Sequence, residues 1–373
     1  MANGLQFSRV IVIWCDKQGG KLPAGLNSRG LRSFFRMIST PAVWVINSVS
    51  VAGMRYRLID LENIQKAQRV IREAANRTPV MTSRTLDARC GAKVFLKCEN
   101  FQRTGSFKFR GASNAIGTLN ERERSAGVVT HSSGNHAQAL ALAAAVSGVR
   151  AKIVMPDGSS PVKVEAVKGY GADVILCENN LASREETAER LIASEGLTLI
   201  HPYNDERVMA GAGTAAAELI EETGPLDLVL APVGGGGLLS GTATSAKGLC
   251  QDTRVWGVEP AGADDAYRSF HTRKLVPQKD PRTIADGLRT SLGDKTFKII
   301  TERVDDIVLA EEEEIIGAMR FLWERMKIVV EPSGAVSLVP VLEGKLPTGR
   351  DLRVGVILSG GNVNLQAFFD TLK

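Results

Sequence analysis

Hydrophobic residues follow two spacings along most of this chain, and each spacing is typical of one kind of secondary structure. Short apolar runs predict strands, and between them apolar residues recur every three or four positions, which predicts helices. One strand–helix series extends from Gly127 to His201. A second series begins near Asp205 and ends with the run Arg353–Leu358. Strands that alternate with helices in this way predict parallel sheets with right-handed crossovers, and therefore an α/β fold.

The same patterns set the expected element boundaries. In the first series we expect strands at residues 127–131, 151–155, 172–177 and 197–201, with helices at 135–146, 160–168 and 181–194. In the second series we expect strands at residues 226–231, 254–258, 305–309 and 353–358. Helices are expected over residues 205–222, from the glycine run at 234–237 to 248, and over 311–326 and 333–342. Residues 261–304 are expected to be rich in loops, and a short strand is expected at residues 93–97.

Composition narrows the class of protein. The 373 residues are 44% hydrophobic and 23% charged, which fits an ordinary α/β enzyme long enough for two domains. The net charge is +5, but the first 58 residues hold eight basic residues against one acid, so the remainder carries about −2. This balance argues against nucleic-acid binding by the folded body. Five cysteines without a CxxC pair indicate a reduced, cytoplasmic protein.

Residues 1–54 form a basic N-terminal extension to which we assign no function. Its apolar run near residues 40–52 is too short to span a bilayer, and the order of regions that marks a secretory signal is lacking, so we expect no membrane partner. Two explanations stay open. The extension is a transit segment for import into an organelle, or the start is mis-assigned and translation begins at Met54.

Lys108 lies between Phe107 and Phe109, at a Gly-Ser turn that opens a predicted helix. Burial beside aromatic side chains lowers the pKa of an amine and makes it a better nucleophile. The alternative is a surface lysine whose stem covers apolar neighbours.

Two glycine-rich segments require different interpretations. Gly234–Gly237 follows an apolar strand and opens a helix, where free backbone amides can bind a phosphate. The segment 211–216 fits the dinucleotide-binding pattern GxGxxA, but it begins inside a predicted helix with no strand before it. We therefore expect these small residues to serve helix packing.

Five blocks of sequence resemble, in order, the serine racemase and threonine (serine) dehydratase family. They are residues 103–111, 132–137, 234–237, 259–260 and 359–362. The resemblance covers residues 55 to the C-terminus. It implies the second fold type of pyridoxal-phosphate enzymes, similar to the tryptophan synthase β chain, with two open parallel-sheet domains. A large discontinuous domain would comprise residues 55–126 and 205–373, and a small domain residues 127–204. The family also implies a homodimer or homotetramer.

The resemblance carries roles onto individual residues. Lys108 would hold pyridoxal phosphate and act as the acid/base group on one face, and Ser133 would act on the other. The remaining cofactor contacts would come from Phe107, Asn135, Gly234, Gly235, Gly236, Gly237 and Ser359. The substrate carboxylate would be bound by Ser132, Ser133, Gly134, Asn135 and His136.

The family also implies sites for a metal ion and a nucleotide. The segment 259–265 supplies carboxylates and backbone carbonyls at a strand end, a donor set that suits Mg²⁺ or Ca²⁺. By resemblance Glu259, the carbonyl of Ala263 and Asp265 match a site for Mg²⁺, Ca²⁺ or Mn²⁺. An ATP site is matched in part by Arg103, Gln138, Tyr170, Lys327 and Asn362. The acidic run 311–314 reads as a helix N-terminus instead.

We therefore expect a threonine/serine dehydratase, an ammonia-lyase that converts L-threonine or L-serine to 2-oxobutanoate or pyruvate and ammonia. The alternative is a serine racemase with elimination as a side reaction. Ala137 stands where mammalian racemases have glycine, which favours the dehydratase. A non-catalytic protein that binds pyridoxal phosphate or amino acids is a third hypothesis, although the presence of Lys108, Ser133 and Ser359 together argues against it.

Overall fold

A six-stranded sheet organises the larger part of the fold. The computed structural model describes residues 58–347 and 351–371, so the predictions for the extension 1–54 lie outside the described residues. The strand order is β1-β2-β10-β7-β8-β9, in which only β1 is antiparallel. The strands are β1 (Val80–Met81), β2 (Lys93–Cys98), β7 (Leu228–Pro232), β8 (Arg254–Pro260), β9 (Asp306–Ala310) and β10 (Arg353–Leu358).

The second sheet has four parallel strands in the order β5-β4-β3-β6. They are β3 (Val128–His131), β4 (Ala151–Pro156), β5 (Asp173–Cys177) and β6 (Thr198–Leu199). All four fall within the segment that is predicted to form the small domain. The last is shorter than predicted, because only Val128 and Val129 of β3 pair with it.

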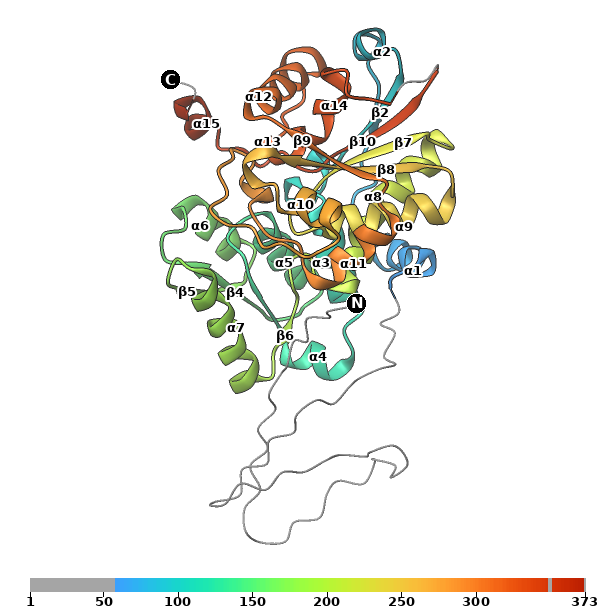
Figure 1. The fold of residues 1–373 in the computed structure, drawn as a ribbon. Helices are drawn as coiled ribbons and strands as arrows, with labels where there is room; N and C mark the ends of the chain where they lie inside the picture. Colours follow the sequence, from blue (N-terminus) through green and yellow to red (C-terminus); the bar gives the residue numbers. More distant parts are fainter. Residues whose placement is uncertain (1–57, 348–350, 372–373) are drawn as a thin grey trace, which may run out of the picture. The chain divides into compact units, whose positions relative to one another are not determined.

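Helices cover both faces of each sheet (Figure 1). One face of the six-stranded sheet packs against α8 (Glu206–Thr223), α9 (Gly237–Leu249), α10 (Asp265–Thr272) and α11 (Asp294–Arg303), with α1 (Leu61–Ile71) against α8 and α9. The other face packs against α2 (Arg84–Cys90), α12 (Glu312–Phe321), α13 (Pro332–Ala335) and α14 (Val339–Leu342). In the second sheet one face is covered by α5 (Asn135–Val146), α6 (Pro161–Gly169) and α3 (Lys108–Gly117), and the other by α7 (Leu181–Glu195). The remaining helices are α4 (Glu121–Ala126) and α15 (Leu365–Thr371). None of the described helices has both the length and the apolar character that a membrane crossing requires.

Two predicted stretches differ from the structure. Residues 261–304, expected to be loops, contain α10 and α11. The expected helix over residues 333–342 is broken into α13, a 3₁₀ turn (Val336–Leu338) and α14, with a proline in the first turn of both short helices. Since proline lacks an N–H, it starts new helical turns more readily than it continues one.

The small residues of the segment 211–216 lie inside α8 and serve helix packing, as predicted. A Cβ on Gly211 would lie 2.5 Å from the Arg110 carbonyl oxygen of α3. A Cβ on Gly213 would lie 2.7 Å from the Gly241 carbonyl oxygen of α9. Helix α8 therefore touches two neighbouring helices backbone to backbone.

Candidate active site

Lys108 is the first residue of α3, and the loop after β10 holds the segment before it. The amide of Phe107 donates to the Ser359 carbonyl at 3.0 Å, and Ser106 forms an isolated bridge with Gly360. The partly buried amine of Lys108 donates to the Pro202 carbonyl at 2.9 Å and lies 5.0 Å from the centre of the Phe107 ring. Burial lowers the pKa of this amine to about 8, and Glu331 partly opposes that shift.

The predicted cause of this pKa shift is right in one part and wrong in another. Burial favours the neutral amine, as expected. The Phe107 ring does not, because the amine lies over the ring, where a positive charge is attracted. The low pKa of Lys108 therefore comes from burial.

The Pro202 carbonyl that meets Lys108 is presented by a turn built on His201. The Nδ1 of His201 accepts the amides of Tyr203 at 3.3 Å and Asn204 at 3.0 Å, so the ring proton lies on Nε2. Burial lowers the pKa of His201 to about 4, helped by His131 and Lys108, which keeps the ring neutral. Nothing in the sequence singles out His201, although its place at the carboxyl end of a predicted strand puts it at the expected ligand edge.

The segment 132–136 forms the turn between β3 and α5. Ser132 Oγ accepts the Gly134 amide at 3.4 Å, and Ser133 lies partly buried between them. The side chain of His136 points into the core, where its Nε2 lies 3.2 Å from the Ile200 carbonyl oxygen. Burial lowers the pKa of His136 well below its ordinary value. Any contact of His136 with a substrate would therefore come from its backbone.

Asn135 is held by two partners that are distant in the sequence. Its Nδ2 donates to Glu331 Oε1 at 2.7 Å, and its Oδ1 accepts Asn362 Nδ2 at 2.9 Å. Burial raises the pKa of Glu331 to about 8, Asp286 adds to the rise, and the Asn135 hydrogen bond and two lysines oppose it. Glu331 is a site residue that sequence reasoning does not find, because no local motif marks it.

The glycine run forms the turn between β7 and α9 and is buried throughout. Gly236 has φ +85°, a conformation that glycine adopts without strain. A Cβ on Gly235 would lie 2.3 Å from Cγ of Tyr203, and one on Gly234 would lie 2.8 Å from Cα of Leu288. Ser359 is buried beside this region at the end of β10 and donates to the Ser333 carbonyl at 3.3 Å. A close-walled turn at a helix N-terminus, near a low-pKa lysine, fits a phosphate-bearing cofactor that binds lysine.

The predicted metal ligands lie together at the end of β8. Glu259 accepts the Ala266 amide at 2.9 Å and the Tyr267 amide at 2.7 Å, and Asp265 Oδ2 accepts the Leu292 amide at 3.0 Å. Burial raises the pKa of both carboxyls, that of Asp265 to about 6 and that of Glu259 well above its ordinary value. Asp265 Oδ1 is buried without a hydrogen-bond partner, which fits a cation. Among the residues with described positions, no cluster of three or more His, Cys, Asp or Glu side chains could hold a metal, so a cation here would also need carbonyls such as that of Ala263.

The residues that match a nucleotide site have other partners in the structure. Arg103 donates to the Ala74 carbonyl at 3.1 Å, and its guanidinium lies 5.0 Å from the centre of the Phe109 ring. Exposed Lys327 donates to the Glu324 carbonyl. Within residues 58–347 and 351–371, no hydrogen bond joins any two of Arg103, Gln138, Tyr170, Lys327 and Asn362. The nucleotide site stays a prediction.

The family model described as "Pyridoxal-phosphate dependent enzyme" matches residues 71–360. A serine racemase from Dictyostelium discoideum is 47% identical over 319 residues, which are 84% of this chain and 98% of the relative. An L-threo-3-hydroxyaspartate ammonia-lyase from Pseudomonas sp is 48% identical over 318 residues, 85% of this chain and 99% of the relative. A solved threonine deaminase from T.th. is 45% identical, with a TM-score of 0.77, over 82% of this chain and 99% of that chain.

Proposed function

The chain belongs to the family of pyridoxal-phosphate dependent enzymes, and on this premise we propose that it is a serine racemase with ammonia-lyase activity toward hydroxy-amino acids. The predicted family, fold type and enzyme class are confirmed. The hypothesis of a non-catalytic binding protein is set aside, because the relatives of this chain are racemases and ammonia-lyases.

The relatives support the alternative prediction, the racemase, better than the main prediction of a threonine/serine dehydratase. The Dictyostelium relative is a serine racemase, and the Pseudomonas relative acts on a hydroxyaspartate. The side chain of Ala137 is fully buried in the core between α5 and the second sheet, so its methyl group takes part in packing.

The observation that carries the proposal is the amine of Lys108. It meets the Pro202 carbonyl at 2.9 Å, and burial lowers its pKa to about 8. A general base works best when its pKa is near the working pH, so this amine can both take and return the α-proton of an amino acid. When bound, pyridoxal phosphate would delocalise the electron pair left at the α-carbon.

Other residues of the site would bind the cofactor, hold the substrate and return a proton to it. The amides of Gly234–Gly237 would bind the cofactor phosphate, and Ser359 would donate to the ring nitrogen. The turn of Ser132–Asn135 would hold the substrate carboxylate, with Asn135 kept in place by Glu331 and Asn362. Ser133 would return a proton to the face opposite Lys108, which inverts the α-carbon.

A second candidate is an ammonia-lyase whose preferred substrate carries a second carboxylate, as in 3-hydroxyaspartate. Arg184 lies close enough to His131, at the end of β3, to lower the pKa of that histidine in addition to the effect of burial. A guanidinium at this edge of the sheet would attract such a carboxylate. The Pseudomonas relative supports this candidate.

One experiment separates the two. The purified protein, loaded with pyridoxal phosphate and Mg²⁺, is incubated in parallel with L-serine, L-threonine and L-threo-3-hydroxyaspartate. D-Serine is measured by chiral chromatography, and keto acids and ammonia are measured in the same samples. We expect D-serine at early times together with slower formation of pyruvate. The Lys108→Ala variant serves as the control and should form neither product.

Keto acid without D-serine would overturn the racemase, and faster turnover of hydroxyaspartate would then establish the ammonia-lyase. Turnover by the Lys108→Ala variant would overturn the assignment of Lys108 in both cases.

Several finer assignments accompany this proposal. We propose Mg²⁺ or Ca²⁺ at Glu259, the Ala263 carbonyl and Asp265, and ATP as an activator that saturable binding in a titration would reveal. A homodimer or homotetramer, a cytoplasmic location and the domain boundaries at residues 127 and 204 remain predictions.

A further inference from the structure

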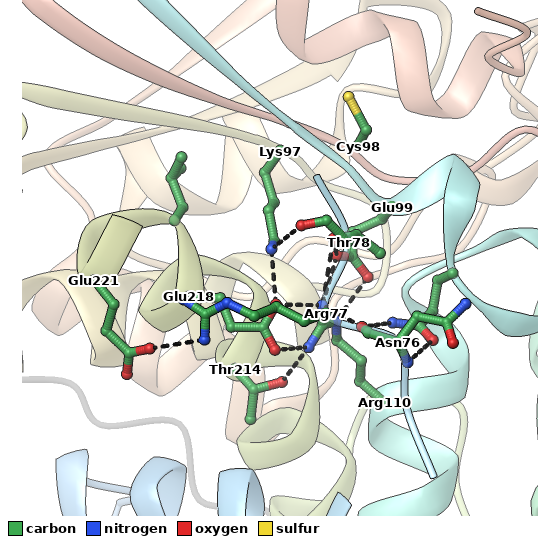
Figure 2. Close-up of polar contacts among 12 residues, drawn as sticks. Asn76, Arg77, Thr78, Lys97, Cys98, Glu99, Arg110, Thr214, Glu218 and Glu221 are labelled. Atoms are coloured by element: carbon green, nitrogen blue, oxygen red, sulfur yellow. Dashed lines mark hydrogen bonds and ion pairs between the residues drawn. The ribbon is translucent and has the colours of Figure 1, made fainter. Parts of the chain in front are cut away.

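Four buried charges lie together beside α3, just past Lys108. Arg110 of α3 and Lys97 of β2 face Glu99, which follows β2, and Glu218 of α8 (Figure 2). The side chains of Arg110, Lys97 and Glu99 are fully buried, and that of Glu218 is 12% exposed. We call these four residues the buried charge network. Its formal net charge is zero.

The planar guanidinium of Arg110 forms two forked pairs of hydrogen bonds, one pair with each glutamate. Toward Glu99 it donates from Nε at 2.7 Å and from Nη2 at 2.9 Å, and toward Glu218 it donates from Nη1 and Nη2, both at 2.8 Å. Thr214 accepts from Nη1 at 3.1 Å. Lys97 completes the network through Glu218 and the Thr78 carbonyl, both at 2.7 Å. Two forked pairs on one side chain fix its direction as well as its position.

The opposite charges of Arg110 and Glu218 stabilise each other. Burial alone would lower the pKa of the Arg110 guanidinium, but Glu99 and Glu218 more than offset this and raise it. Burial alone would raise the pKa of Glu218, but Arg110 and Lys97 lower it.

The network also holds α3 at a fixed rotation. Arg110 bonds Glu99, directly after β2, and Glu218 of α8, which Lys97 of β2 also bonds, so α3 is tied to the larger sheet and to a helix that covers it. Beside the network, a Cβ on Gly111 would lie 2.8 Å from the Val208 carbonyl oxygen, and one on Gly211 would lie 2.5 Å from the Arg110 carbonyl oxygen. With the backbones of α3 and α8 in contact and Arg110 forked on both sides, α3 cannot roll without breaking these bonds.

This fixed rotation matters because Lys108 begins the same helix. Residues two apart on an α-helix point about 200° apart, so Arg110 and Lys108 project to opposite sides of α3. The partner of the Lys108 amine, the Pro202 carbonyl, lies just before α8. Helix α3 is therefore linked to α8 through Arg110, and to the segment that precedes α8 through Lys108.

We propose that Arg110 is a positioning residue, which sets the rotation of α3 and thereby the direction from which the Lys108 amine approaches the cofactor. Apolar side chains of similar volume often stabilise a core as well as a buried ion pair does, so stability alone does not call for this network. The paired hydrogen bonds of Arg110 fix the orientation of the helix, which apolar packing alone does not. The proposal rests on the function proposed for Lys108.

The test compares Arg110→Lys and Arg110→Met with a matched control. Lys keeps the charge but loses both forks, and Met loses the charge as well. The control is Lys152→Met, which breaks the partly buried pair of Lys152 and Glu195 at 2.6 Å in the second sheet. Each full-length variant is measured with and without pyridoxal phosphate for its midpoint of thermal unfolding. The loaded proteins are also measured for the visible circular dichroism of the cofactor, for kcat and for KM.

For Arg110→Lys we expect kcat to fall between about ten- and a hundredfold, because a small misplacement of a reacting group costs this much. KM should stay within about twofold, since the substrate-binding turn is untouched. The circular dichroism band should weaken, and the rise in unfolding midpoint on loading should shrink. Lys152→Met should lower both midpoints equally and leave the band unchanged.

An Arg110→Lys variant with the band and kcat of the wild type, changed only in its unfolding midpoints, would overturn the proposal and leave Arg110 a structural residue. Should Arg110→Met fail to fold, Glu218→Gln and Thr214→Val each remove one partner and carry the same comparison. Lys108→Ala tests the proposed function separately from the role of Arg110. If this variant keeps the visible band and turnover, the proposed role of Lys108 fails, whatever the Arg110 variants show.

Discussion

At the scale of single residues, burial brings the pKa values of two unlike groups of the site, an amine and a carboxyl, close together. It lowers the pKa of the Lys108 amine to about 8 and raises that of the Glu331 carboxyl to about 8. It also lowers the pKa of His201 to about 4, so this imidazole stays neutral at neutral pH. Lys108 and Glu331 therefore have similar pKa values, and the charge of each opposes the effect of burial on the other.

The pKa of Lys108 predicts how fast the protein without cofactor binds pyridoxal phosphate covalently. Only the neutral amine reacts, so the rate should rise about tenfold per pH unit below pH 8 and level off above it. An ordinary lysine would give a rate that keeps rising to about pH 10.4. Stopped-flow absorbance between pH 6 and 10 measures this. A rate that still climbs steeply above pH 9 would contradict the lowered pKa.

How much of the site can be predicted from the sequence depends on how far apart along the chain its contacting residues lie. Lys108, Gly234–Gly237 and the turn at 132–136 are marked by local motifs at strand ends. Glu331 meets Asn135 across 196 positions of sequence, and Arg110 meets Glu218 across 108. Such pairs are fixed by tertiary packing, which the local pattern does not encode. His201 acts through local bonds, but they require a turn that hydrophobic periodicity does not reveal.

At the scale of elements, the sequence pattern predicts well where an apolar stretch is buried along most of its length. The helix Asn135–Val146 and the strand Arg353–Leu358 have their predicted bounds, and apolar residues fill most of their buried positions. Helices α10 and α11 are not predicted, since side chains outside these helices hold their first turns. Glu259 accepts two amides of α10, and Asn204 accepts the Lys295 amide of α11.

The crossing of α3 and α8 gives a prediction at this scale. Gly211→Ala would place a Cβ 2.5 Å from a backbone oxygen of α3, and should cost about 1–3 kcal/mol of unfolding free energy. Gly317→Ala is the control, because it lies in α12 with no atom within 4 Å of the added Cβ. It should gain about 0.5–1 kcal/mol. Urea unfolding measures both, and equal stability of the two variants would contradict the tight crossing.

At the scale of the whole molecule, the pair Glu259 and Asp265 predicts that a divalent cation stabilises the fold. Asp265, the first residue of α10, accepts the amide of Leu292 just before α11, and its other oxygen lacks a hydrogen-bond partner. A ligand that binds only the folded state at 100 times its Kd adds about 2.7 kcal/mol of stability. We therefore expect Mg²⁺ or Ca²⁺ to raise the midpoint of thermal unfolding by several degrees over EDTA. Asp265→Asn should abolish the rise, and an equal rise in that variant would place the cation elsewhere.

The two groups proposed to handle the α-proton are held by elements that pack against each other. Lys108 begins α3, which is tied to the six-stranded sheet through Arg110, and Ser133 follows a strand of the four-stranded sheet. Helix α3 also packs against α5 and the four-stranded sheet through Phe109 and Ala112, so it links the two sheets. The distance between the two groups therefore depends on this helix contact. A substitution in the contact that shifts α3 against α5 would change the ratio of D-serine to keto acid without altering a catalytic group.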